Sequence, residues 1–391
     1  DLAAAFATVA FVAFISLLVD RSFTATQYAL LASVGTAGRT LLASSSGAMR
    51  WAYIGQLEQG STSRMRFEAL QMILGDEICS VDLSPLLHTS KISDFLAWRF
   101  KEGPAIGKIS QSIMGQFESI DCVDLIWIDK AAFIAKDAMK FLRQKASHLL
   151  HFTPDPAFVY HKSRHFLSSV GLYDTLVTTK RYELDHYNQF KSEGASVILV
   201  PQGIDLNVHR DSCAFDDKKV AISFIGHAEP SRIRLLNYLL NQGIPIYLAG
   251  RGWQSCVSKN KRYLNNTLFY AGEGIYGSAY GEFLSSCLFS LGLVSDLAPD
   301  LTTTRTLEIP ACGSAIFLPR NEESVSLFGE DEAFFYSGQE DIVTQYFESL
   351  ADMPALKQKI CKAKERVQRD FTYESIIRNI LNQCVPWEVC K

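Results

Sequence analysis

Residues 300–313 read Asp300-Leu301-Thr302-Thr303-Thr304-Arg305-Thr306-Leu307-Glu308-Ile309-Pro310-Ala311-Cys312-Gly313. A threonine-rich polar loop runs here into a short predicted helix that carries an inward acid, Glu308, and ends at a glycine. The first turn of a helix offers free backbone N–H groups and a positive dipole end, which suit a diphosphate. A carboxylate further along suits sugar hydroxyls, because these are uncharged hydrogen-bond donors. The stretch therefore predicts a nucleotide-sugar site with Asp300 and Glu308 as its two acids.

The composition is that of an ordinary globular protein. The chain has 391 residues, of which 48% are apolar and 20% charged, which is enough for two or three domains. The net charge of −4 gives no basic field, so nucleic acid is not expected as a partner. The nine cysteines include no Cys-x-x-Cys pair, which favours a cytoplasmic protein over a disulfide framework or a zinc site.

Residues 1–48 differ from the rest and form an apolar, predicted helical segment. Residues 2–19 are almost entirely apolar, at the lower limit for a membrane span, and the chain begins with Asp1. Two segments resemble the last membrane helices of AmpG-like permeases of the major facilitator type. They are Thr24-Ala25-Thr26-Gln27-Tyr28-Ala29-Leu30-Leu31 and Gly38-Arg39-Thr40-Leu41-Leu42. Two interpretations of residues 1–47 stay open: a fusion or gene-boundary artefact, or an anchor at the inner face of the membrane. Under the first interpretation, Met49 would be the native start of the remaining chain.

From residue 49 onward, short apolar runs alternate with amphipathic stretches. Strands are expected at 50–55, 78–83, 123–128, 148–152, 175–178 and 196–200, and again at 220–225, 245–249, 268–270, 288–291, 315–318 and 333–336. Helices are expected at 63–74, 130–144, 160–170, 181–193, 231–241, 276–285, 306–312, 340–350, 355–369 and 373–382. The alternation predicts an α/β protein with two doubly wound parallel sheets.

This pattern divides the chain into an apolar segment (1–48), a Rossmann-like domain (49–209) and a second Rossmann-like domain (210–372). A last helix within 373–391 would cross back to the first domain. Ligands of such sheets bind outside the carboxyl ends of the strands, so two facing domains predict a cleft.

Two strand ends carry candidate phosphate-binding loops. Gly60, Ser61 and Thr62 follow the first strand, either as a plain turn with a serine cap or as a loop that lines the cleft. Gly226 ends the first strand of the second domain, and Arg232 follows at a helix start. That arginine either binds a diphosphate or pairs with Glu229 on the surface.

Three further positions are weaker candidates. Gly252 precedes Trp253 at a third strand end, as a tight turn or as a shelf for a nucleobase. His151 and Asp155 lie at the carboxyl end of a strand and could face the cleft as catalytic groups. The alternatives are a half-buried histidine and an aspartate that caps a turn. No set of metal ligands is apparent, so no metal is expected.

Residues 49 to about 385 resemble the CgeB-like group within the glycosyltransferases group 1. The resemblance is carried by Gly60-Ser61-Thr62-Ser63, Phe224-Ile225-Gly226, Arg305-Thr306-Leu307-Glu308-Ile309-Pro310-Ala311-Cys312-Gly313 and Glu365-Arg366-Val367-Gln368-Arg369-Asp370-Phe371-Thr372-Tyr373. It implies a GT-B fold, in which two Rossmann-like domains face a cleft and the second holds most of the donor. In the family's Glu-x7-Glu pattern the second acid matches Glu308, expected on the ribose, and the first position holds Asp300, one methylene shorter.

The resemblance also implies an activity. A sugar would be transferred from a nucleotide-diphosphate sugar to a hydroxyl of a glycan, lipid or protein. The transfer would retain the configuration and need no metal or other cofactor. Bacterial cell-envelope or polysaccharide glycosylation is of this kind. Arg232, Arg305 and the N–H groups near Thr304 would stabilise the leaving phosphate. The alternative is a protein of this fold that binds a nucleotide-sugar or glycan without turnover, which Asp300 in place of glutamate favours.

Overall fold

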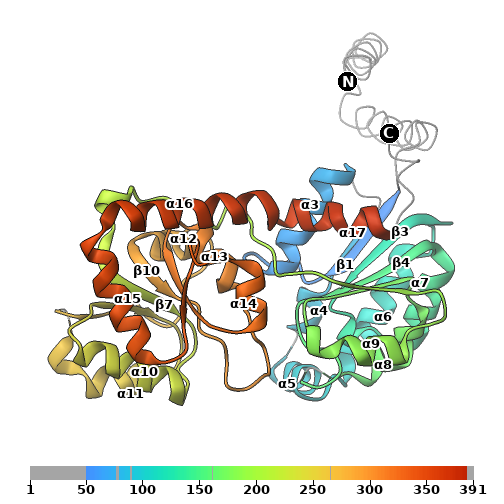
Figure 1. Cartoon of the computed structure of the whole chain (residues 1–391). Coiled ribbons are helices and arrows are strands. Elements are labelled where there is room, and N and C mark those ends of the chain that lie inside the picture. The colour runs from blue at the N-terminus through green and yellow to red at the C-terminus, as the bar shows by residue number, and fades with distance from the viewer. Residues whose placement is uncertain (1–49, 76–78, 89, 161, 265, 385–391) are drawn as a thin grey trace, which may run out of the picture. The chain divides into compact units, whose positions relative to one another are not determined.

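The computed structural model describes residues 50–384, with gaps at 76–78, 89, 161 and 265 (Figure 1). Residues 51–384 belong to one compact unit. The predictions for residues 1–48, including the membrane anchor, lie outside the described part, as does the end of the chain from residue 385. Within the described part, no helix combines the length and the apolar character that crossing a bilayer requires.

The first half of the unit is a six-stranded parallel sheet with the strand order β2-β1-β3-β4-β5-β6. Its strands are β1 (Trp51–Gly55), β2 (Cys79–Asp82), β3 (Val123–Asp129), β4 (Ala146–Thr153), β5 (Thr175–Thr178) and β6 (Ser196–Leu199). Its helices are α3 (Thr62–Leu74), α4 (Ser84–Leu87), α5 (Lys91–Phe100), α6 (Pro104–Phe117), α7 (Lys136–Lys145), α8 (Arg164–Ser169) and α9 (Leu184–Phe190). Every residue of β1 is buried, as expected for a strand covered on both faces.

The second half repeats this architecture with the strand order β12-β11-β10-β7-β8-β9, again all parallel. Its strands are β7 (Lys219–Ile225), β8 (Ile246–Ala249), β9 (Leu268–Tyr270), β10 (Cys287–Leu291), β11 (Ala315–Pro319) and β12 (Phe334–Tyr336). Its helices are α10 (Pro230–Asn241), α11 (Gln254–Lys259), α12 (Ser278–Ser285), α13 (Arg305–Ala311), α14 (Glu322–Leu327), α15 (Gln339–Ala351), α16 (Met353–Asp370) and α17 (Tyr373–Cys384). The strand order reverses between β7 and β10, and such a reversal is where ligands of doubly wound sheets bind.

The chain passes between the two sheets twice, and the two crossings are hydrogen-bonded to each other. The N–H of Ile204 donates to the carbonyl of Phe371 (2.9 Å), and the N–H of Tyr373 donates to the carbonyl of Ile204 (2.9 Å). A Cβ at Gly203 would lie 2.4 Å from the Tyr373 ring, so only glycine fits this crossing. Helix α17 then packs against α3 of the first half (Figure 1).

Four stretches differ from the expected elements, and two of them are α11 and α14, which lie where no helix was expected. The short helices α4 to α6 occupy residues 84–117, where no element was expected, although α6 buries Ile106, Ile109 and Ile113 at helical spacing. The helix predicted at 130–144 begins only at Lys136. Lys130 adopts a left-handed φ of 56° that breaks the helical path, and a single 3-10 turn, Ala131–Phe133, follows.

Candidate functional site

A cavity of about 430 Å³ lies at the strand-order reversal of the second sheet. We call it the switch-point cavity. Its walls come from both halves of the unit, and the lining residues are Gly60, Thr62, Met65, Val208, His209, Ile225, Gly226, His227, Gly250, Arg251, Glu273, Gly274, Ile275, Tyr276, Gly277, Tyr280, Thr304, Arg305 and Glu308. It therefore contains most of the predicted donor-binding residues, together with two residues of the predicted cleft loop.

Glu308 is held in the wall of this cavity by two other side chains. It lies on α13, is 6% exposed, and accepts a hydrogen bond from the Tyr280 hydroxyl. The other oxygen, Oε1, is 3.6 Å from His209 Nε2. Because His209 Nδ1 accepts the backbone N–H of Asp205 (3.1 Å), the proton of a neutral ring is on Nε2, facing Glu308. Burial and the Glu308 charge both raise the pKa of Tyr280, so its hydroxyl remains a donor.

His209 and Tyr280 were not predicted from the sequence. They precede Glu308 by 99 and 28 positions (308 − 209 and 308 − 280), on a loop and on α12. No local pattern links either residue to Glu308.

Arg305 lines this cavity and has a buried donor without a partner. Its Nε is buried and finds no hydrogen-bond partner within the described chain. Its guanidinium lies 5.9 Å from the centre of the Phe224 ring. A buried guanidinium N–H without a partner is unfavourable, so an anionic ligand in the cavity would satisfy it. Thr304, the residue before it, also lines the cavity.

Arg232 is placed differently from the phosphate-binding prediction. It is 4% exposed and does not line the cavity. One guanidinium nitrogen donates to the carbonyl of His227 (3.0 Å) and lies 2.7 Å from Glu229, and the other donates to the carbonyl of Val294 (2.9 Å). This is the alternative ion pair with Glu229, buried instead of on the surface.

Among the predicted glycines, Gly226 lines the cavity whereas Gly252 does not. Gly250 has φ +127°, and a Cβ there would lie 2.0 Å from the Gly226 carbonyl oxygen, so the two strand ends meet closely. Trp253 is fully buried and donates from Nε1 to the same oxygen (2.8 Å). Of the two alternatives for this strand end, the structure therefore has the tight turn and not the nucleobase shelf.

In the first half, the loop after β1 contributes to the cavity lining and also caps a helix. Gly60 and Thr62 line the switch-point cavity. Ser61 caps α3, since its Oγ accepts the backbone N–H of Arg64 (3.1 Å) and donates to the carbonyl of Gln56 (2.9 Å). The cap fixes the loop that carries its two neighbours.

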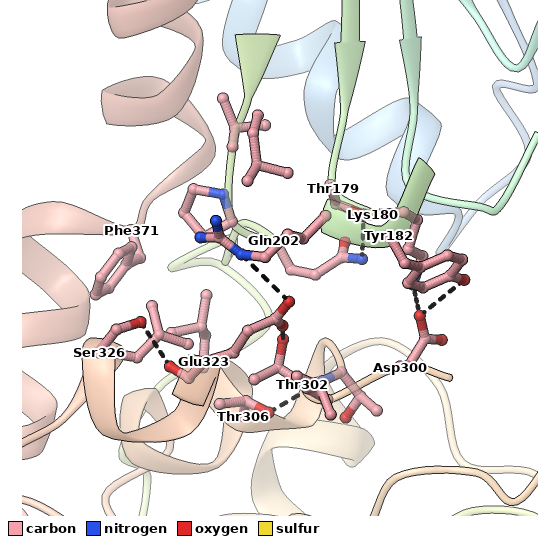
Figure 2. Close-up of a pocket in the computed structure, with 18 residues that line it drawn as sticks. Thr179, Lys180, Tyr182, Gln202, Asp300, Thr302, Thr306, Glu323, Ser326 and Phe371 are labelled. Atoms are coloured by element: carbon pink, nitrogen blue, oxygen red, sulfur yellow. Dashed lines mark hydrogen bonds and ion pairs between the residues drawn. The ribbon is translucent and has the colours of Figure 1, made fainter. Parts of the chain in front are cut away.

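Asp300 lines a different cavity from Glu308. In this cavity of about 310 Å³, Asp300 Oδ1 accepts from Lys180 Nζ (2.8 Å) and from the Tyr182 hydroxyl (3.2 Å). Figure 2 shows these two side chains, which follow β5, pointing toward Asp300 across the cavity. The structure thus does not bring the two predicted acids together, because the loop 300–304 runs between their cavities.

His151 and Asp155 lie in a third cavity of about 110 Å³, which we call the lysine cavity after Lys101 and Lys130 in its lining. His151 is 1% exposed and stacks on Phe166, and burial lowers its pKa to about 3, so it is neutral at physiological pH. Asp155 is 3.0 Å from Lys130 Nζ. The pair therefore lies outside the cavity that holds Glu308. Among residues 50–384 as described, no group of three His, Cys, Asp or Glu side chains could hold a metal ion.

Comparison with known proteins agrees with the fold. Residues 232–382 match the family model described as glycosyl transferase-like. Anabaena HepE in complex with UDP has a similar structure, with 13% identity and a TM-score of 0.60 over 86% of this chain and 99% of that one. Sucrose-phosphate synthase of Thermosynechococcus elongatus gives 14% identity and 0.58 over 86% and 98% of the two chains. A glycosyltransferase of Rickettsia africae has 11% identity and a TM-score of 0.59 over 88% of this chain and 99% of that one.

The chain has the GT-B fold, and its second half carries a glycosyltransferase-like domain. A search of curated protein sequences gave no match. Assignment to the CgeB-like group stays a prediction, and the permease-like words lie outside the described residues.

Proposed function

We propose that the protein is a glycosyltransferase that moves a sugar from a nucleotide-diphosphate sugar to an acceptor hydroxyl. The observation that carries the proposal is one cavity that holds a buried carboxylate, Glu308, beside a guanidinium with a free donor, Arg305. A ribose diol donates hydrogen bonds and a diphosphate accepts them, so the two groups match the two ends of a nucleoside diphosphate. The UDP complex of HepE supports this assignment by analogy of fold.

In the proposed reaction, the acceptor oxygen attacks the anomeric carbon and the nucleoside diphosphate leaves. Negative charge grows on the leaving phosphate, and Arg305 with the backbone near Thr304 would stabilise it in place. Retention of configuration is the outcome that the family resemblance implies. Asp300 is engaged by Lys180 on the other side of the loop, so we assign donor binding to Glu308 and Arg305.

Isothermal titration with UDP and UDP-glucose tests the site. Glu308→Gln and Arg305→Gln should each weaken binding roughly 10- to 100-fold, because hydrogen bonds to charged groups contribute about 1.5–3 kcal/mol. Glu322→Gln and Arg320→Gln change exposed residues near α14 and should bind like the unaltered protein. Unchanged affinity in Glu308→Gln would remove the assignment.

The alternative is a protein that binds a nucleotide-sugar without turnover. The position of Asp300 favours it, since the acid that the family pattern places on the donor sugar is held by Lys180 and Tyr182 in another cavity. Release of UDP from UDP-glucose, measured with a panel of glycan and lipid acceptors, separates the two. Tight binding without release under every condition would favour the alternative.

A further inference from the structure

Helix α5 exposes its large apolar side chains to solvent, unlike an ordinary surface helix. Its small residues Ser93 and Ala97 are buried, whereas its large apolar side chains face solvent. The exposed fractions are 76% for Ile92, 60% for Phe95, 43% for Trp98 and 57% for Phe100. Amphipathic helices normally bury such residues, and a contiguous exposed apolar patch indicates a binding surface.

The patch continues into the lysine cavity through Trp98, which belongs to both. Lys101 follows the helix, is 8% exposed, and lies between the rings of Trp98 and Phe133, 5.5 and 5.0 Å from their centres. Lys130 stands in the same lining, close to Asp155. Because its lining has two cations and one anion, the cavity carries a net positive charge.

His151 gives the lysine cavity a second, independent sign of a ligand. Its Nδ1 is buried and has no hydrogen-bond partner among the residues that the structure describes. A buried polar atom of this kind costs about 1–3 kcal/mol unless something pairs with it. A polar group bound in the cavity would supply that partner.

One loop contributes residues to both the lysine cavity and the switch-point cavity. Gln56 lines the first, and Gly60 and Thr62 line the second, so the loop 56–62 has one end in each. An acceptor has to stand beside the donor for the transfer to occur. The lysine cavity is therefore a candidate acceptor site, because this loop joins it to the cavity that holds Glu308.

We infer that the acceptor is an anionic amphiphile embedded in a lipid bilayer, with α5 inserted among the acyl chains and the anionic head group in the lysine cavity. This inference rests on the proposed glycosyl transfer. On the surface of residues 91–102, Lys91 and Arg99 are balanced by Asp94 and Glu102, so the net positive charge comes from Lys101 in the lysine cavity, which complements an anionic head group. Aromatic side chains flanked by basic residues are typical of helices that lie in the membrane interface.

A protein partner fits the patch less well. An aromatic side chain covers roughly 150–250 Å² when fully buried. Scaled by their exposed fractions, the three aromatic side chains offer roughly 240–400 Å², and Ile92 is a fourth, smaller contributor. A standard protein interface takes about 800 Å² from each partner.

Quenching of tryptophan fluorescence by brominated lipids tests the inference on the full chain. The fifth tryptophan of the chain, Trp387, lies outside the described residues and is replaced by phenylalanine in every protein of this assay. Of the other four, Trp98 is exposed whereas Trp51, Trp127 and Trp253 are fully buried, so quenching by acyl-chain bromines then reports mainly on α5. We expect quenching on vesicles of brominated phosphatidylcholine with phosphatidylglycerol, and its loss in Trp98→Phe. Because the quenched fluorescence comes from Trp98, membrane binding by another segment of the chain does not mask the result for α5. Quenching of Trp98→Phe equal to that of the unaltered protein overturns the inference.

Two further variants separate the apolar and ionic parts. Phe95→Ser should require about tenfold more lipid for the same quenching, because burying a phenylalanine side chain is worth about 1.5–3 kcal/mol. Phe347→Ser, on α15 and 51% exposed, is the matched control and should leave quenching unchanged. Lys101→Gln and Lys130→Gln should each weaken the dependence on phosphatidylglycerol about fivefold. The proposal is refuted if Phe95→Ser and Phe347→Ser have equal effects, or if quenching is equal without phosphatidylglycerol. UDP binding is measured separately, and normal UDP binding in every variant would leave the proposed donor site unaffected.

Discussion

Replacing His151 by glutamine should make the stability of the protein less sensitive to acid. Burial lowers the pKa of His151 to about 3, compared with about 6.5 for a histidine in an unfolded chain. Between these values the unfolded chain binds a proton that the folded protein does not, so stability falls as the pH falls. At pH 5 this group costs about 2 kcal/mol relative to neutral pH, and at pH 3 about 4 kcal/mol. The side chain is fully buried, so solvent does not weaken the effect.

The assay is urea unfolding at about pH 7.5 and about pH 5, comparing the loss of free energy of unfolding between the two. His151→Gln should lose about 2 kcal/mol less than the unaltered protein. Exposed His88 provides the control variant His88→Gln, which should retain the full loss. Burial also lowers the pKa of His148, but that contribution is common to all three proteins. An equal loss in His151→Gln and the unaltered protein would refute the reasoning, as would an NMR titration of His151 near pH 6.5.

Four other changes test side-chain packing and backbone positions in both halves. Arg66→Leu leaves Asp129 without its fully buried partner, 2.6 Å away, and should lower the free energy of unfolding by about 3–5 kcal/mol, with partial recovery on adding Asp129→Leu. Gly250→Ala places a Cβ 2.0 Å from a backbone carbonyl oxygen and should destabilise the protein and weaken UDP binding in calorimetry. Gly243→Ala has a positive φ but open space, and should cost only about 1–3 kcal/mol in urea unfolding. Ser61→Ala removes the cap of α3 and should cost about 1 kcal/mol by the same measurement.

The strands were predictable because buried parallel strands form short apolar runs between polar residues and glycines. β5 and β9 begin and end where the sequence predicts, since their runs are short and bounded on both sides. Of the missed helices α4 to α6, α5 was missed for a physical reason, whereas the buried isoleucines of α6 do have helical spacing. α5 buries small residues and exposes large ones, so its pattern contradicts the usual relation between apolar periodicity and burial.

The part of the site that could be predicted is the part that is local in sequence. Thr304, Arg305 and Glu308 lie on one loop and the following helix, so a single stretch places them in one cavity. His209 and Tyr280 reach Glu308 only through the packing of a distant loop and of α12. A tertiary contact of this kind has no periodic signature in the chain.

Asp300 shows how such a contact changes the interpretation of a motif. Lys180, at the end of β5, is 8% exposed, and a cation buried to that degree requires a counter-charge, which Asp300 supplies at 2.8 Å. A donor sugar that bound Asp300 would have to displace this partner, and breaking a buried ion pair costs up to about 3–5 kcal/mol. Neutral sugar hydroxyls give no more than about 1.5–3 kcal/mol per hydrogen bond to a charged group. The favourable role for Asp300 is therefore to tie the 300–304 loop to the first sheet, which fixes Thr304 and Arg305 at the wall of the switch-point cavity.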